Sequence, residues 1–122
     1  MYDKLKHLIS EQLIEIDINK ECIKLKFRKG IVGKDKNEDI EDNSLYFYGK
    51  YIHDNKLEAF ATRELKKIFQ SKNGDRLVLS FESGSITLLL PTSRADKPIM
   101  MEYHQERQPV LIWDKEGKVF TI

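Results

Sequence analysis

Alternation of apolar and polar residues predicts two β-hairpins with defined registers. In the first, every second residue from 14 to 18 and from 23 to 27 is apolar, and the polar residues 19–22 lie between them as a turn. One register pairs the apolar residues with one another: Ile18 with Ile23, Ile16 with Leu25, and Ile14 with Phe27. The same register pairs opposite charges on the other face: Asp17 with Lys24, and Glu15 with Lys26. A slip of one residue would lose both sets of pairs, so the pattern indicates a sheet with one solvated face.

The second hairpin turns at Ser83-Gly84. Apolar residues alternate on both sides of this turn: Leu77, Leu79 and Phe81 before it, and Ile86, Leu88 and Leu90 after it. We expect Phe81 to pair with Ile86. Further strands are predicted where β-branched and aromatic residues gather: 45–52, 99–103, 110–113 and 119–122.

Two segments have the three- and four-residue spacing of amphipathic helices. Residues 2–12 place Leu5, Leu8 and Ile9 on one face. A second helix is expected from Asn55, which would cap its N-terminus with Glu58 at the third helical position, to the glycine at position 74. Its apolar stripe consists of Leu57, Phe60, Ala61, Leu65, Ile68 and Phe69.

These elements predict an α+β fold. We expect an antiparallel, curved sheet of about seven or eight strands, with the two helices packed on its apolar face. The charged stretch 34–43 has no periodicity and is predicted to be a loop.

Composition agrees with one soluble domain spanning residues 1–122. Hydrophobic residues make up 40% and charged residues 34% of the 122 residues, and the net charge is +1, so no global field attracts nucleic acid or a membrane. No apolar run is long enough to span a bilayer, and the N-terminus lacks the apolar core of a signal peptide. Cys22 is the only cysteine, which excludes an internal disulfide. We therefore expect a cytoplasmic protein.

The sequence offers little catalytic chemistry. Glu102 and His104 share one strand face and could supply two metal ligands, but a metal site needs at least one more. Cys22 has no histidine placed beside it, and His7 is interpreted as an ordinary surface histidine. The segment around Gly84 lacks the pattern of a nucleophile elbow. We expect no metal, no cofactor and no enzymatic activity; a small enzyme with a dispersed site remains an alternative.

A basic stripe and an aromatic strand form the first surface feature. The stripe consists of Lys24, Lys26 and Arg28, and it would lie near the aromatic residues of segment 45–52. Cations beside aromatic rings can bind single-stranded nucleic acid. The expected pairing with Asp17 and Glu15 favours a solvated sheet face instead, because mixed charge does not attract phosphate.

The acidic segment 38–42 is the second surface feature. It is either a solvated loop or an acidic finger whose one apolar anchor is Ile40. Such a finger could be steered onto a basic partner, with exposed aromatic residues of the next strand as further anchors. The candidate partner-binding residues are Glu38, Asp39, Ile40, Glu41, Asp42, Tyr46 and Tyr48.

The organisation of the chain resembles that of a bacterial protein class. A strand followed by Phe-x-x-Gly occurs at Phe27 and again at Phe81, and Glu102-Tyr103 is followed by Trp113, a turn and a short terminal strand. This arrangement in a small chain rich in Lys, Ile, Glu and Asn resembles the immunity proteins of contact-dependent and polymorphic toxin systems. The resemblance implies a cytoplasmic protein that covers the active site of a cognate toxin domain, usually a nuclease. The alternatives are a regulatory or structural module that forms a homodimer through an edge strand, and single-stranded nucleic-acid binding.

Overall fold

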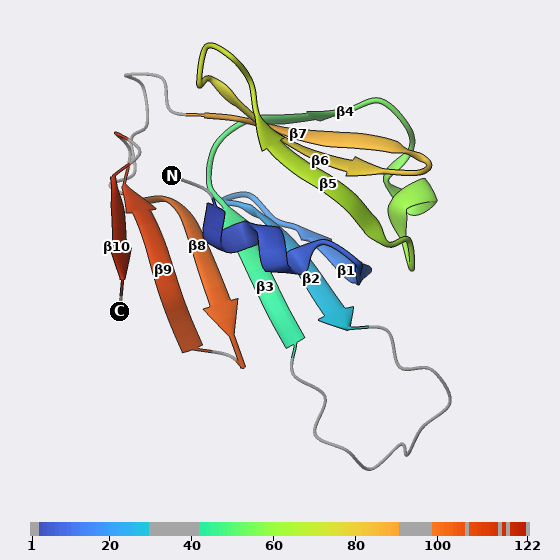
Figure 1. Ribbon diagram of the computed structural model, residues 1–122, viewed down its shortest axis with the longest axis horizontal. Coiled ribbons are helices and arrows are strands. Elements are labelled where there is room, and N and C mark those ends of the chain that lie inside the picture. Colours follow the sequence, from blue (N-terminus) through green and yellow to red (C-terminus); the bar gives the residue numbers. More distant parts are fainter. Residues whose placement is uncertain are drawn as a thin grey trace.

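The structure, a computed structural model, is built almost entirely from antiparallel strands (Figure 1). It describes residues 3–29, 42–90, 99–106, 108–114, 116 and 118–121. Within these residues there are ten strands and two short 3₁₀ helices: η1 Asp3–Leu8, β1 Glu11–Ile18, β2 Ile23–Lys29, β3 Asp42–Phe47, β4 Tyr51–His53, η2 Leu57–Phe60, β5 Leu65–Gln70, β6 Arg76–Phe81, β7 Gly84–Leu89, β8 Ile99–Gln105, β9 Gln108–Asp114 and β10 Val119–Thr121.

The strands form two sheets. The six-stranded sheet has the order β1-β2-β3-β8-β9-β10, and the four-stranded sheet has the order β4-β7-β6-β5. In Figure 1 the four-stranded sheet lies above the six-stranded one, and η1 crosses in front of β3. Buried apolar side chains from both sheets and from η1 form one core, with Trp113, Tyr103 and Phe27 among its largest members.

The predicted α+β fold with two helices is wrong, and so is the single sheet of seven or eight strands. The helix expected from Asn55 is replaced by η2 and β5. A β-bulge interrupts β5 between Leu65 and Lys67. The extra residue brings Leu65 and Ile68 to the same buried face although they are three positions apart. A three-residue spacing of buried apolar residues also occurs along the buried face of an amphipathic helix. Phe69, which the stripe would have buried, is 51% exposed.

The helix expected over residues 2–12 is also shorter than predicted. It is the six-residue 3₁₀ helix η1, which buries Leu5 and Leu8 in the core. Ser10 then has a positive φ of 80°, and its backbone N–H donates to the Leu65 carbonyl. Strand β1 begins at Glu11, within the predicted helix.

The register of the first hairpin is confirmed for four consecutive pairs: Ile18–Ile23, Asp17–Lys24, Ile16–Leu25 and Glu15–Lys26. A bulge between Leu13 and Glu15 then shifts the pairing, so Leu13 and not Ile14 lies opposite Phe27. Leu13 is buried there. The backbone of Leu13 also bonds to the chain before β5, because its N–H donates to the Arg63 carbonyl and its carbonyl accepts from Thr62. These bonds join an edge of the six-stranded sheet to an edge of the four-stranded sheet.

The predicted register of the second hairpin is wrong by two residues. Phe81 lies opposite Gly84, so the turn consists of Glu82 and Ser83 alone. Gly84 has a φ of 142°, and a Cβ at this position would overlap with the Asp54 carboxylate. That carboxylate accepts the backbone N–H of Ser85 at 2.7 Å and thereby fixes the turn.

The predicted strand 45–52 is divided between the two sheets. Strand β3 begins at Asp42, inside the predicted loop, and ends at Phe47, whereas β4 begins at Tyr51. Among the described residues, no strand pairs with the outer edges of β4 and β10. β1 and β5 are the other two edge strands, and they are joined only around Leu13 and Leu65.

Candidate functional site

One row of side chains crosses the whole six-stranded sheet on its solvated side. Strand pairing places one residue of each strand in line: Asp17, Lys24, Tyr46, Glu102, Ile112 and Phe120. The neighbouring row lies on the inner side of the sheet: Ile18, Ile23, Phe47, Met101, Trp113 and Val119. Its four central members are buried in the core, whereas Ile18 and Val119 at its ends are exposed. We call the solvated side the outer face. Along its central row the chemistry changes from charged at β1, through aromatic at β3, to apolar at β9 and β10.

Tyr46 lies at the centre of the outer face and is fixed by its neighbours. The Lys24 ammonium is 5.5 Å from the centroid of its ring, within the range of a cation–π contact. On the other side, the centroid of the His104 ring is 4.6 Å away. The ring is half-buried between these groups and still partly accessible. Tyr46 is therefore an aromatic group held in one orientation on the sheet surface.

Tyr48 and Glu102 continue this cluster. The Tyr48 hydroxyl donates to the Glu102 carboxylate, whose second oxygen is 3.3 Å from Nε2 of His104. Burial and the hydrogen bond to Glu102 raise the pKa of Tyr48 above its usual value, so the phenol remains a neutral donor. The cluster joins β8 to β3 and to the residues that follow β3.

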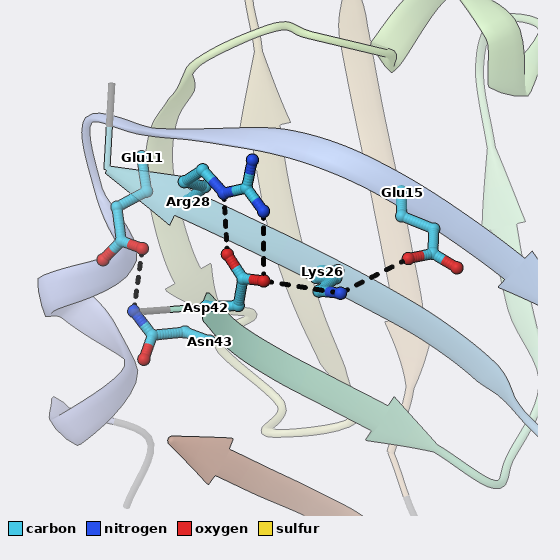
Figure 2. Close-up of polar contacts among 6 residues, drawn as sticks. All are labelled: Glu11, Glu15, Lys26, Arg28, Asp42 and Asn43. Carbon is cyan, nitrogen blue, oxygen red and sulfur yellow. Dashed lines mark hydrogen bonds and ion pairs between the residues drawn. The ribbon is translucent and has the colours of Figure 1, made fainter. Parts of the chain in front are cut away.

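An ion-pair network lies on the outer face at the end of β2 and the beginning of β3 (Figure 2). The Arg28 guanidinium donates two hydrogen bonds to Asp42, from Nε at 2.7 Å and from Nη2 at 3.2 Å. Lys26 Nζ is 3.4 Å from Asp42 and 3.7 Å from Glu15. The hydrogen bond from Arg28 and the two nearby cations lower the pKa of Asp42 below its ordinary value. Asp42 is therefore a structural partner of β2 rather than a free acidic group.

Figure 2 also shows a polar contact beside this network. Asn43 donates from Nδ2 to the Glu11 carboxylate at 2.8 Å. Only 7% of Glu11 is exposed. Glu11 and Asn43 alternate with the outer-face residues along their strands, so this contact belongs to the inner side of the sheet.

The charges of the described outer face nearly balance. Three cations, Lys24, Lys26 and Arg28, face four carboxylates: Glu15, Asp17, Asp42 and Glu102. Arg28 and Lys26 are bound to Asp42. Phosphate binding depends on uncompensated cations, and two of these three cations are already paired with Asp42.

The predicted partner-binding residues divide into two groups. Glu38, Asp39, Ile40 and Glu41 lie outside the described residues. Asp42, Tyr46 and Tyr48 all lie on the outer face, where β3 and its extension bring them into one line. The sequence analysis placed Glu102 and His104 on one strand face, but it missed their contacts with Tyr46 and Tyr48. Those contacts depend on the pairing of β3 with β8, which are distant in the sequence.

The other candidate residues have local roles. His53 Nδ1 is 2.7 Å from the Asn55 carbonyl, and Asn55 donates to the Ser83 carbonyl rather than capping a helix. Cys22 is half-exposed in the first hairpin turn, which the Asn19 side chain closes through hydrogen bonds. In the described part of the chain, no three or more His, Cys, Asp and Glu side chains are grouped as metal ligands.

Comparisons with known proteins leave the outer face to be interpreted from its own chemistry. No protein-family model matches the chain, and neither the curated proteins nor the solved structures contain a significant match. Of the helices within the described residues, none has the length and apolar character needed to cross a membrane.

Proposed function

We propose that this protein is a protein-binding module and that the outer face of the six-stranded sheet is its binding surface. The observation that carries the proposal is the row from Asp17 to Phe120. It offers paired charges at one end, a fixed aromatic residue at the centre and an apolar end at Phe120, which is 54% exposed. Protein interfaces obtain most of their affinity from a few aromatic or arginine anchors surrounded by polar groups. Anchors that are already held in place lose little conformational entropy on binding.

The partner that fits this proposal best is a cognate toxin domain in the cytoplasm, with the protein acting as its immunity protein. The sequence resemblance supports this partner. The acidic residues 38–41 immediately precede Asp42, which is itself on the outer face. A nuclease active site is basic because it holds phosphates, and a neighbouring acidic segment would steer the two proteins together. In this account the immunity protein covers the active site and is not itself an enzyme.

The test is affinity capture from native cell lysate with three tagged proteins: wild type, Tyr46→Ser and Phe69→Ser. Phe69 is an exposed aromatic residue of the four-stranded sheet and serves as the matched control. We expect one stoichiometric partner that is captured by wild type and by the Phe69 variant, and lost with Tyr46→Ser. Equal capture by all three proteins, or recovery of the bait alone, contradicts the proposal.

A homodimer through β10 is the second candidate function. Val119 and Phe120 of this free edge strand are both exposed, and an unpaired strand edge can pair with a second copy. Light scattering over a hundredfold range of protein concentration distinguishes the two candidates. A dimer that Phe120→Ser dissociates would favour this alternative, whereas a monomer at every concentration excludes it.

A further inference from the structure

A cavity opens between η1 and the inner side of the six-stranded sheet, opposite to the outer face. Its volume is about 370 Å³. The lining residues come from η1, β8 and β9: Lys4, His7, Tyr103, Gln105, Val110 and Leu111. This size lies within the range of small-molecule pockets. None of the lining residues belongs to the outer face, so the cavity is a separate feature.

The geometry of η1 explains why the side chains of Lys4 and His7 border the cavity together. A 3₁₀ helix has three residues per turn, so residues three apart lie directly above one another. Leu5 and Leu8 form one such line and are buried in the core. Lys4 and His7 form the adjacent line, at the rim of the cavity. Both rim residues are exposed, so their donor groups are accessible to a ligand from solvent.

A hydrogen-bonded chain fixes the polar side of the cavity. Gln105 Nε2 donates to the hydroxyl of buried Tyr103 at 3.4 Å, and this hydroxyl is hydrogen-bonded to Nε2 of His7. Burial raises the pKa of Tyr103 to about 12, and the nearby Glu11 carboxylate contributes to this rise. The phenol is therefore neutral near neutral pH. This hydrogen bond uses Nε2 of His7, so Nδ1 is the ring nitrogen left for a ligand.

Two nitrogen atoms at the rim have no partner among the described residues: Nζ of Lys4 and Nδ1 of His7. The opposite wall is apolar. Val110 is half-buried there, and Leu111 and the Tyr103 ring, which are 2% and 1% exposed, reach it only at their edges. Glu11 lies near Tyr103, and its negative charge disfavours an anion deep in the cavity. A ligand that satisfies these three conditions has an anionic group at the rim and an apolar body inside.

We propose that this cavity binds a small carboxylate with an apolar body, such as an arylalkanoate. The carboxylate accepts hydrogen bonds from Lys4 and His7, and the apolar part contacts Val110, Leu111 and the Tyr103 ring. This site lies on the other side of the sheet from the proposed partner surface and does not depend on it.

The probe for this proposal is phenylacetate, added to isotope-labelled wild-type protein and followed by NMR titration. Phenylacetamide lacks the charge and acetate lacks the apolar body, so both serve as ligand controls. We expect saturable shifts of the His7 and Tyr103 signals with phenylacetate, and at least tenfold weaker binding of both controls. Equal effects of the three compounds, or no shifts at these residues, would overturn the proposal.

Two matched variants test the role of the rim. Lys4→Gln removes the rim ammonium, whereas Lys6→Gln makes the same change on η1 at a residue that does not line the cavity. We expect Lys4→Gln to weaken phenylacetate binding about tenfold and Lys6→Gln to leave it unchanged. Equal weakening by the two variants would indicate general charge attraction and would contradict the site.

Discussion

Asp42 accepts two hydrogen bonds from Arg28, at 2.7 Å and 3.2 Å, and so links β3 to β2 at the end of the outer face. Its position gives it a different role from the acidic residues that precede it in the sequence. The neighbouring carboxylates remain candidates for steering a partner, whereas Asp42 stabilises the sheet. The two roles can be separated by mutation.

Asp42→Asn should destabilise the protein modestly. The ion pair is two-pronged but partly exposed, with 24% of the Asp42 side chain accessible, so we expect a loss of about 0.5–1 kcal/mol. Glu64→Gln is the control, because Glu64 contacts Lys66 at 3.5 Å in a more exposed pair. Urea unfolding at neutral pH should show a clearly larger loss for Asp42→Asn. Equal losses of unfolding free energy in the two variants would mean that the two hydrogen bonds between Arg28 and Asp42 add nothing to stability.

The same pair predicts a dependence of stability on pH. The pKa of Asp42 is lowered in the folded state, so the unfolded chain binds the proton first as the pH falls. The stabilisation is complete above the unfolded pKa of about 3.9 and is lost as the pH falls through the lower folded value. The difference in unfolding free energy between wild type and Asp42→Asn should therefore be constant near neutral pH and shrink below about pH 4. A difference that does not change down to pH 2.5 would contradict this assignment.

The residues before Asp42 should affect the rate of association with the partner. The triple variant Glu38→Ser, Asp39→Ser and Glu41→Ser leaves the Arg28 pair intact. We expect association to slow about tenfold at low salt, and the difference to vanish at high salt, where the charges are screened. Stopped-flow kinetics with the captured partner measures the association rate at low salt and at high salt. Unchanged association rates at low salt would remove these residues from the interface.

The bulge in β5 makes neighbouring residues respond differently to truncation. Ile68 is buried, and Ile68→Ala should cost about 2–4 kcal/mol through lost contacts and a cavity. Phe69 points to solvent, so Phe69→Ala should change stability by less than about 0.5 kcal/mol. Thermal unfolding of the two variants measures the contrast. Comparable losses would contradict the exposed position of Phe69 in β5.

Gly84 should tolerate substitution worse than Gly74, the other glycine with positive φ among the described residues. Gly84→Ala places a methyl group against the Asp54 carboxylate and requires a φ of 142°, so we expect a loss of at least about 2 kcal/mol. Gly74 has a φ of 74°, and a Cβ there would meet only the end of the Gln70 side chain. Gly74→Ala should therefore cost about 1 kcal/mol. A Gly84 variant as stable as the Gly74 variant would be inconsistent with the observed turn.

Local patterns predicted the antiparallel hairpins, but they could not reveal the bulges. The four confirmed pairs from Glu15–Lys26 to Ile18–Ile23 depend on strict alternation on both strands. A bulge adds one residue and changes the spacing of inward residues from two to three, as at Leu65 and Ile68. Three-residue spacing is also the mark of a helix, so the sequence pattern was ambiguous there. The predicted register of the second hairpin was wrong for a different reason: Gly84 begins β7 instead of lying at the centre of the turn.

The candidate site was partly predictable in the same way. Asp42, Tyr46 and Tyr48 share the alternation of one strand, so their common face follows from the sequence. Their partners Glu102 and His104 come from β8, and the pairing of β3 with β8 is set by the whole topology. The cavity beside η1 needed the structure as well, because it requires Lys4 and His7 to meet Tyr103.

The most direct test of the outer face as a binding surface uses two exposed phenylalanines. Phe120 lies on the outer face and Phe69 on the four-stranded sheet, and they are 54% and 51% exposed. The dissociation constants of the captured partner should be measured for Phe120→Ser and Phe69→Ser alongside wild type. The account predicts at least tenfold weaker binding for Phe120→Ser and wild-type binding for Phe69→Ser. Wild-type binding by Phe120→Ser, or equal weakening by both variants, would contradict it.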